Sequence, residues 1–299
     1  MSPVEFLNYF FLQLVYGLSF GLLYGLMAVG LSLIFGVTKM INFAHGEIYM
    51  LGGYTYFFTI TLVGLSPVLA MLSSALVGIL IGVMMERYVF RPAYNMQQQA
   101  RDEYAIIATF GLSILLQNLA LFWFGTAIRT PPPIFDAKLT FGLLELFGDR
   151  VAAIVISSTI LITLYLYVAK SWTGAALRAV SQNMNAASIL GISKTKMNAL
   201  SLAVGGGLAA LAGALLSNVL LVYPDMGVIP TLKAFVIIVL GGMGSIFGSL
   251  VGGLLLGVVE ALGSTFVSVA YRDVYGFIVL ILVLLLKPNG LFGELARRI

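Results

Sequence analysis

The sequence predicts an all-α fold, a polytopic membrane helix bundle of about 8 transmembrane helices with a broken or re-entrant helix near residues 241–244. Of its 299 residues, 60% are hydrophobic and only 9% are charged, whereas roughly 25% of the residues in a soluble domain are charged. A chain this poor in charge cannot solvate its own surface, so we expect membrane lipid around it. Long stretches without any charged residue recur along the whole chain.

The charge-free stretches give the expected spans in chain order. About 20 apolar residues cross a bilayer, and six stretches are long enough to do so: residues 6–38, 48–85, 104–128, 151–169, 197–224 and 234–259. The stretch 48–85 is too long for one helix, and Pro67 suits the first position of a second helix, so we expect a tight hairpin there. Residues 274–286 are short for a span, but Tyr271 and Lys287 can anchor its ends at the two interfaces.

Glycines interrupt some of these spans and form stripes on others. Gly241, Gly242 and Gly244 divide the last long stretch into two short pieces, which predicts the broken or re-entrant helix. Small residues also recur at four-residue intervals on single helix faces, as in Gly17, Gly21 and Gly25, and in Gly205, Ala209, Gly213 and Ser217. Such stripes let helix backbones approach closely, and lining of a pathway is the alternative. We find no convincing internal repeat and interpret residues 1–299 as a single transmembrane domain.

The positive charges predict how the chain is oriented. Residues 170–198 contain Lys and Arg but no acidic residue, and loops rich in Lys and Arg stay on the cytoplasmic side. Residues 86–103 carry three arginines among acidic residues, and we place them on the same side. Because the spans alternate in direction, residues 125–150 and the N-terminus are then expected outside.

Several classes of chemistry are excluded by residues that the sequence lacks. No Gly-x-x-x-x-Gly-Lys-Ser/Thr loop is present, so the chain does not hydrolyse ATP by that route. There is no cysteine and only one histidine, which argues against a metal site. The charges gather at the ends of spans, which disfavours a proton relay, and the positive residues are scattered, which disfavours nucleic acid as a partner. We therefore expect neither an enzyme nor a cofactor in this chain.

Residues 171–198 form the most informative polar segment. Apolar and polar side chains alternate there at near-helical spacing, which predicts one or two short amphipathic helices along the cytoplasmic face. Gly191 is placed to end the last of them. Such a helix either connects two spans or docks its small side chains into a groove of a partner protein.

Within this segment the pattern GxxxRAVxxNxxAAxxxGI resembles the loop by which permease subunits of the branched-chain amino acid family of ABC importers contact their ATPases. Residues 30–54, 233–260 and 287–293 also resemble segments of that family, in the family's order. The residues that match the loop pattern are Gly174, Arg178, Ala179, Val180, Asn183, Ala186, Ala187, Gly191 and Ile192.

The resemblance implies a permease domain over residues 1–299, with residues 171–198 as its cytoplasmic ATPase-coupling segment. It implies a bacterial inner (plasma) membrane importer for leucine, isoleucine and valine, built with a second homologous permease subunit, two cytoplasmic ATPases and a periplasmic or extracellular binding protein. ATP and Mg would be bound by the partner ATPases. A permease of a urea or amide importer remains an alternative, as does a self-sufficient channel or secondary carrier for a small neutral solute.

Two groups of residues are candidates for the translocation pathway. Asn42, His45 and Glu47 could gate the inner mouth of a pathway or belong to an ordinary capped loop. The same glycines that break the helix, Gly241, Gly242 and Gly244, could present half-helix termini to a zwitterion or serve close packing.

Overall fold

The computed structural model describes residues 3–135, 137–141 and 144–293 and consists almost entirely of helices. The two short strands pair as an antiparallel hairpin, with Lys138 opposite Phe147. The helices and strands are α1 (Pro3–Thr38), α2 (His45–Thr61), α3 (Pro67–Met85), η1 (Glu86–Phe90), η2 (Arg91–Asn95), α4 (Gln98–Phe124), β1 (Lys138–Phe141), β2 (Leu144–Phe147), α5 (Gly148–Lys170), α6 (Trp172–Gln182), α7 (Met184–Ile189), α8 (Lys194–Leu220), α9 (Val228–Gly241), α10 (Ile246–Phe266), η3 (Val269–Tyr271) and α11 (Arg272–Leu286).

The number of spans agrees with the sequence prediction of about 8. Within the described residues, 7 helices are long and apolar enough to cross a membrane, and α9 is a shorter apolar helix. The stretch 48–85 divides into two helices as expected, with Pro67 in the first turn of α3. The hairpin between α4 and α5 was not predicted, because its strands are only 4 residues each.

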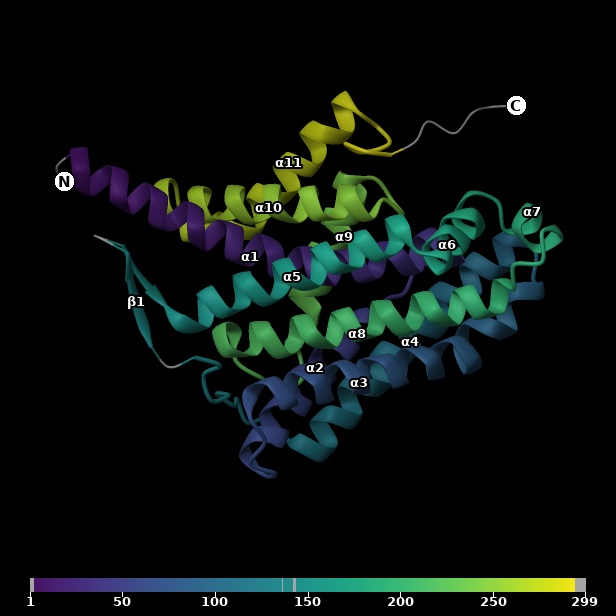
Figure 1. The fold of residues 1–299 in the computed structure, drawn as a ribbon, viewed down its shortest axis with the longest axis horizontal. Helices are drawn as coiled ribbons and strands as arrows, with labels where there is room; N and C mark the ends of the chain where they lie inside the picture. The colour runs from purple at the N-terminus through teal and green to yellow at the C-terminus, as the bar shows by residue number, and fades with distance from the viewer. Residues whose placement is uncertain (1–2, 136, 142–143, 294–299) are drawn as a thin grey trace.

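The elongated bundle has two distinct ends (Figure 1). The start of α1 and the strand β1 lie at one end, which we call the hairpin end, and α6 and α7 lie at the other, the α7 end. The long helices α1, α5 and α8 run between these ends, with α8 antiparallel to α1 (Figure 1). This arrangement gives the molecule the two faces that a protein spanning a membrane requires.

Helix α2 is a half-helix that begins deep inside the bundle. After α1 ends at the α7 end, Lys39 adopts a left-handed conformation with φ 57°, and the chain turns back into the bundle. The helix α2 then begins at His45, whose Nε2 lies 3.2 Å from the carbonyl oxygen of Met27. Met27 precedes the end of α1 by eleven residues, or about 16 Å along the helix. The irregular segment 39–44 is therefore re-entrant and reaches about half the depth of a bilayer.

Helix α9 is the counterpart of α2, entered from the hairpin end. There α8 is followed by Leu221, which also has a left-handed φ, 69°, and residues 221–227 lead back into the bundle. A β-carbon added to Gly46 would lie 2.6 Å from the carbonyl oxygen of Gly227, so the N-termini of the two half-helices meet. Lys39 and Leu221 are the non-glycine residues with positive φ in the described chain, and each reverses the chain into a half-helix.

The two half-helices belong to two halves of inverted topology, α1 to α4 and α8 to α11. The helix α1 packs along α10, and α8 packs along α3 in the same manner. Glycines make both contacts close: Gly21 faces Gly253 across the first, and Gly206 faces Gly78 across the second. Close packing thus accounts for the predicted glycine stripes, and the internal repeat that could not be read from the sequence is visible in the fold.

The buried core gathers around α1, α2, α8 and α9, whereas α3, α4, α5 and α11 expose apolar side chains suited to lipid. The helix break predicted near residues 241–244 is the turn between α9 and α10.

Candidate functional site

The central feature of the structure is the point where α2 and α9 begin side by side. Gly46 and Gly227 face each other there through their backbones, and a side chain on either would overlap the other residue. Thr231 donates a hydrogen bond of 2.6 Å to the carbonyl oxygen of Gly227. Two helix N-termini at mid-depth place backbone N–H groups and positive dipole ends inside the bundle.

The three predicted residues of the first candidate group, Asn42, His45 and Glu47, all lie at this point and are buried. Asn42 accepts a hydrogen bond of 3.1 Å from the backbone N–H of Ala44, as a residue that caps a loop does. The Nε2 atom of His45 contacts the carbonyl oxygen of Met27 on α1. Glu47 is only 3% exposed, and its Oε1 accepts a hydrogen bond of 2.9 Å from Ser113. Within the described part of the chain, Asn42 Nδ2, His45 Nδ1 and Glu47 Oε2 are buried without a hydrogen-bond partner, which is costly in a packed core.

A stripe of polar side chains on α4 faces this point. Thr109, Ser113 and Gln117 follow one another at four-residue spacing, which places them on one side of the helix. Thr109 accepts a hydrogen bond of 3.2 Å from the backbone N–H of Phe43. Gln117 donates one of 3.0 Å to Asp225, which belongs to the second re-entrant segment. The stripe therefore joins the two re-entrant segments along a single polar line.

The aromatic ring of Phe43 lies between α4 and α9. Its ring centroid is 5.2 Å from that of Phe235 on α9 and 6.3 Å from that of Phe110 on α4. Irregular backbone at membrane depth is tolerated only where protein or a water-filled cavity covers it. The face between α4 and α9, which we call the half-helix face, is therefore unsuited to lipid.

The predicted glycines of the second candidate group lie elsewhere, at the α7 end. Gly241 packs against the backbone of Gly248, and Gly242 against that of Gly293. A β-carbon on Gly244 would lie 3.1 Å from Gly36 of α1. These glycines make close helix contacts, and the half-helix N-termini are those of α2 and α9 instead.

A cluster of charged side chains from α9, α10 and α11 lies toward the hairpin end of the bundle. Lys233 donates hydrogen bonds of 2.5 and 2.6 Å to the two carboxylate oxygens of Glu260 and also lies 2.9 Å from Asp273. Arg272 approaches Glu260 at 3.5 Å, and the ammonium group of Lys233 lies 5.1 Å from the ring centre of Tyr24. Lys233 is thus the main partner of Glu260.

The segment predicted to couple to ATPases folds into two short helices, α6 and α7, as the pattern indicated. Gly174 lies so close to Val168 that any side chain would overlap the backbone there, and Arg178 donates a hydrogen bond to the same carbonyl group. Ala179 is half-buried beside them. Asn183 caps α7 by accepting hydrogen bonds of 3.1 and 3.0 Å from two backbone N–H groups.

The remaining residues of this pattern divide between a buried and an exposed side of α7. Ala187 is 2% exposed and packs with Leu33 and Val37 of α1, and Ile192 packs partly against the same cluster. Ala186 is exposed, and Gly191 ends the segment with φ 83° and open space around it. The large apolar side chains that do project outward are Ile189, 87% exposed, and Leu190, 79% exposed.

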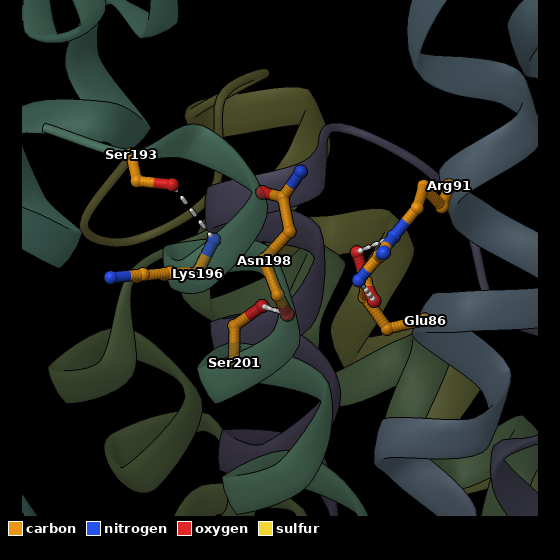
Figure 2. A network of polar contacts seen from close by, with 6 residues as sticks. All are labelled: Glu86, Arg91, Ser193, Lys196, Asn198 and Ser201. Atoms are coloured by element: carbon orange, nitrogen blue, oxygen red, sulfur yellow. Dashed lines mark hydrogen bonds and ion pairs between the residues drawn. The ribbon is translucent and has the colours of Figure 1, made fainter.

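Polar side chains of η1, η2 and the start of α8 lie close together at this end of the molecule (Figure 2). Glu86, 1% exposed, accepts two hydrogen bonds from Arg91, at 3.3 and 2.7 Å. Figure 2 shows Asn198 between this ion pair and the pair formed by Ser193 and the backbone of Lys196. Each of these hydrogen bonds is local to its own segment, and the amide of Asn198 is buried without a hydrogen-bond partner among the described residues.

Sequence reasoning missed Lys233 and the polar stripe of α4. Lys233 stands at the edge of a charge-free stretch and was therefore interpreted as the end of a span. The four-residue spacing of Thr109, Ser113 and Gln117 was a signal that could have been found. Within the described residues, no three His, Cys, Asp or Glu side chains gather in a way that could hold a metal ion.

Comparison with known proteins gives a consistent result. Residues 13–285 match the family model described as the branched-chain amino acid transport system, permease component. The chain is 35% identical to the high-affinity branched-chain amino acid transport system permease protein LivH of Salmonella typhimurium, over 96% of each chain. It is 36% identical to the corresponding protein BraD of Pseudomonas aeruginosa, over 94% of this chain and 95% of the relative.

A more distant relative is the permease protein LivM of Salmonella typhimurium, 26% identical over 90% of this chain and 68% of the relative. No solved structure matches the chain.

Proposed function

The chain belongs to the family of permease components of branched-chain amino acid transport systems, and from this premise we propose that it is the translocation subunit of an ATP-driven importer for leucine, isoleucine and valine. The observation that carries the proposal is the family match over residues 13–285, together with 34–36% identity to LivH and BraD over nearly the whole chain. The protein is a multi-pass membrane protein, and the inner membrane of a bacterium is the proposed location.

The half-helix face is the proposed wall of the pathway. It combines two helix N-termini, the buried carboxylate of Glu47 and the polar stripe of α4. Its irregular backbone needs cover by water or protein, and a second permease subunit facing it would supply both a partner wall and a wet gap. Asn42 and His45 hold the first re-entrant segment in place beside that gap.

The energy for transport is proposed to come from partner subunits. The chain contains no phosphate-binding loop, so it is proposed to act as a passive, non-enzymatic subunit. ATP and Mg are assigned to two cytoplasmic ATPases that receive the outward-facing apolar tip of α7. Because Ala187 packs against α1, movement of this tip would pass directly to the helix that leads into the first half-helix.

The orientation follows from the charge distribution. Lys170, Arg178, Lys194 and Lys196 lie in or beside α6 and α7 without an acidic residue in the segment 170–198, which supports a cytoplasmic location for the α7 end. The hairpin end is then outside, where a binding protein would deliver the solute.

The function is tested by uptake in reconstituted vesicles. We expect concentrative leucine uptake when this chain is combined with a homologous permease, two ATPases, ATP and a loaded binding protein. Vesicles with this chain alone should neither hydrolyse ATP nor accumulate leucine. Accumulation by the chain alone would identify a self-sufficient carrier, and uptake of urea instead of leucine by the full complex would reject the amino-acid assignment.

The coupling role is tested at the exposed tip of α7. Leu190→Asp places a charge on an apolar side chain that projects from the protein, so folding should be unaffected while docking to the ATPase is lost. We expect leucine uptake to fall at least about tenfold, the loss typical of one interface anchor. The matched control is Leu62→Asp, because Leu62 is equally exposed, at 77%, but lies at the opposite end. Normal uptake by the α7 variant would exclude this docking surface.

A further inference from the structure

The ion cluster around Lys233 lines a cavity that opens toward the outer side of the protein. Its volume is about 240 Å³, and it lies between the end of α8, the second re-entrant segment and the start of α11. Asp273 stands at its rim with a side chain that is 59% exposed, whereas Glu260 lies deeper and is 2% exposed. The lining residues are Tyr24, Leu220, Tyr223, Met226, Ile229, Pro230, Lys233, Arg272 and Asp273.

The inverted halves contain a matched pair of such cavities. The helix α11 begins with Arg272 and Asp273, and its counterpart α4 carries the same dipeptide, Arg101 and Asp102, near its start. That dipeptide lines a second cavity at the cytoplasmic end, about 570 Å³ in volume, beside the first re-entrant segment. Each re-entrant segment thus has an Arg-Asp pair at its mouth, but a deeply buried Lys–Glu pair is present only at the outer one among the described residues.

The charges of the outer cavity balance. Lys233 and Arg272 supply two positive charges, and Glu260 and Asp273 supply two negative ones. Ion pairs buried in a membrane protein commonly mark a solute or ion pathway. The rim carboxylate of Asp273 is the more exposed partner of Lys233, so it is the one that can be displaced without leaving the buried Glu260 unpaired.

We propose that this outer cavity is a binding site for a zwitterionic α-amino acid within the permease itself. The carboxylate of the solute takes the place of Asp273 on Lys233 and is also held by Arg272. The displaced Asp273 then pairs with the solute's ammonium group. The apolar wall of Leu220, Met226 and Ile229 receives the side chain.

This site would separate amino acids from other small solutes. A zwitterion replaces one internal ion pair by two pairs of the same kind, so no charge is left uncompensated. Urea or an amide offers neither a carboxylate nor an ammonium group and cannot displace Asp273 from Lys233. The inference rests on the proposed function and assigns its substrate class to named side chains.

The experiment uses the complete permease–ATPase complex in nanodiscs without binding protein or nucleotide. Leucine is titrated while binding is followed by saturation-transfer NMR. We expect saturable binding to the wild type, weakened at least about tenfold by Arg272→Gln and by Asp273→Asn, the loss typical of one charge-assisted hydrogen bond. Both side chains are partly exposed, so neither change unpairs the buried Lys233 and Glu260.

The matched controls are Arg101→Gln and Asp102→Asn at the cytoplasmic cavity, which should bind leucine as the wild type does. Leucinamide, which lacks the carboxylate, and 4-methylpentanoate, which lacks the ammonium group, should not compete. Equal affinity in all variants, or no saturable binding by a complex that still imports leucine, would overturn the site while retaining the proposed function. A complex that imports no leucine with every partner present would reject both.

Discussion

The two inverted halves of the molecule share an architecture but differ in the polar groups they bury. In the first half, α1 to α4, the buried carboxylate Glu47 has only the hydroxyl of Ser113 as its partner among the residues that the structure describes. In the second half, α8 to α11, the buried carboxylate Glu260 is held by Lys233 at 2.5 Å and approached by Arg272. The first half therefore has uncharged polar side chains on α4 beside a buried carboxylate without a basic partner among the described residues. The second half has a cluster in which acidic and basic side chains pair with one another.

The two halves therefore share a backbone arrangement but differ in the polar side chains that they bury. Close glycine contacts and left-handed reversals at Lys39 and Leu221 produce the half-helix in each half. The polar side chains occupy positions that are not equivalent between the halves. We infer that each half supplies one of the two central helix N-termini. We also infer that the two halves make different contacts to the solute.

The largest effect is expected where the ion cluster is broken on one side. Glu260→Leu leaves Lys233 buried beside the single exposed acid Asp273, and removing one partner of a buried ion pair costs about 3–5 kcal/mol. The free energy of unfolding in detergent should fall by that amount. The double variant Lys233→Met with Glu260→Leu removes both charges and should recover most of the loss. Equal stability of the single and double variants would show that the stability of the protein does not depend on pairing Lys233 with Glu260.

A smaller effect is expected where the halves touch. Gly46→Ala places a methyl group against the backbone of Gly227, and overpacking of a tight contact costs about 1–3 kcal/mol. Gly227→Ala should cost a similar amount, because it crowds the same contact from the other half. The control is Gly111→Ala on α4, where nothing lies within 4 Å. Thermal unfolding of the three variants measures the difference, and a Gly46 variant as stable as the control would contradict the contact.

The smallest effect is expected at the neutral partner of Glu47. Ser113→Ala removes one hydrogen bond between membrane helices, which is worth about 0.6 kcal/mol on average and up to about 1.7 kcal/mol. Stability should change little, while leucine uptake falls because Glu47 loses its orientation. Ser73→Ala on α3 is the control, since its hydroxyl bonds only within its own helix. Equal uptake by both variants would remove Ser113 from the proposed pathway.

Much of the fold was predictable because span length and charge are local properties. The hairpin before Pro67, the paired amphipathic helices after Trp172 and the break at Gly241 were all confirmed. Half-helix termini were predicted at residues 241–244, but the helix starts at His45 and Val228 were not, because they depend on contacts such as that of Gly46 with Gly227, 181 residues later in the chain.

The candidate site was predictable in part for the same reason. Asn42, His45 and Glu47 stand out as polar residues near an apolar run, and the structure brings them together at the first half-helix. Lys233 did not stand out, because its partner Glu260 lies on another helix. For α7 the pattern marked the segment but not its outward side, since Ala187 turns inward and Leu190 turns outward.

The most direct test of the account asks whether water reaches the half-helix face at mid-depth. The chain has no native cysteine, so Ser113→Cys on that face can be compared with Leu115→Cys on the opposite side of α4, which is 54% exposed. In the reconstituted complex, a charged, membrane-impermeant thiol reagent should modify the cysteine at position 113 and block leucine uptake, and should leave position 115 unmodified. Modification of position 115 alone, or of neither position during active transport, would contradict a pathway along the half-helix face.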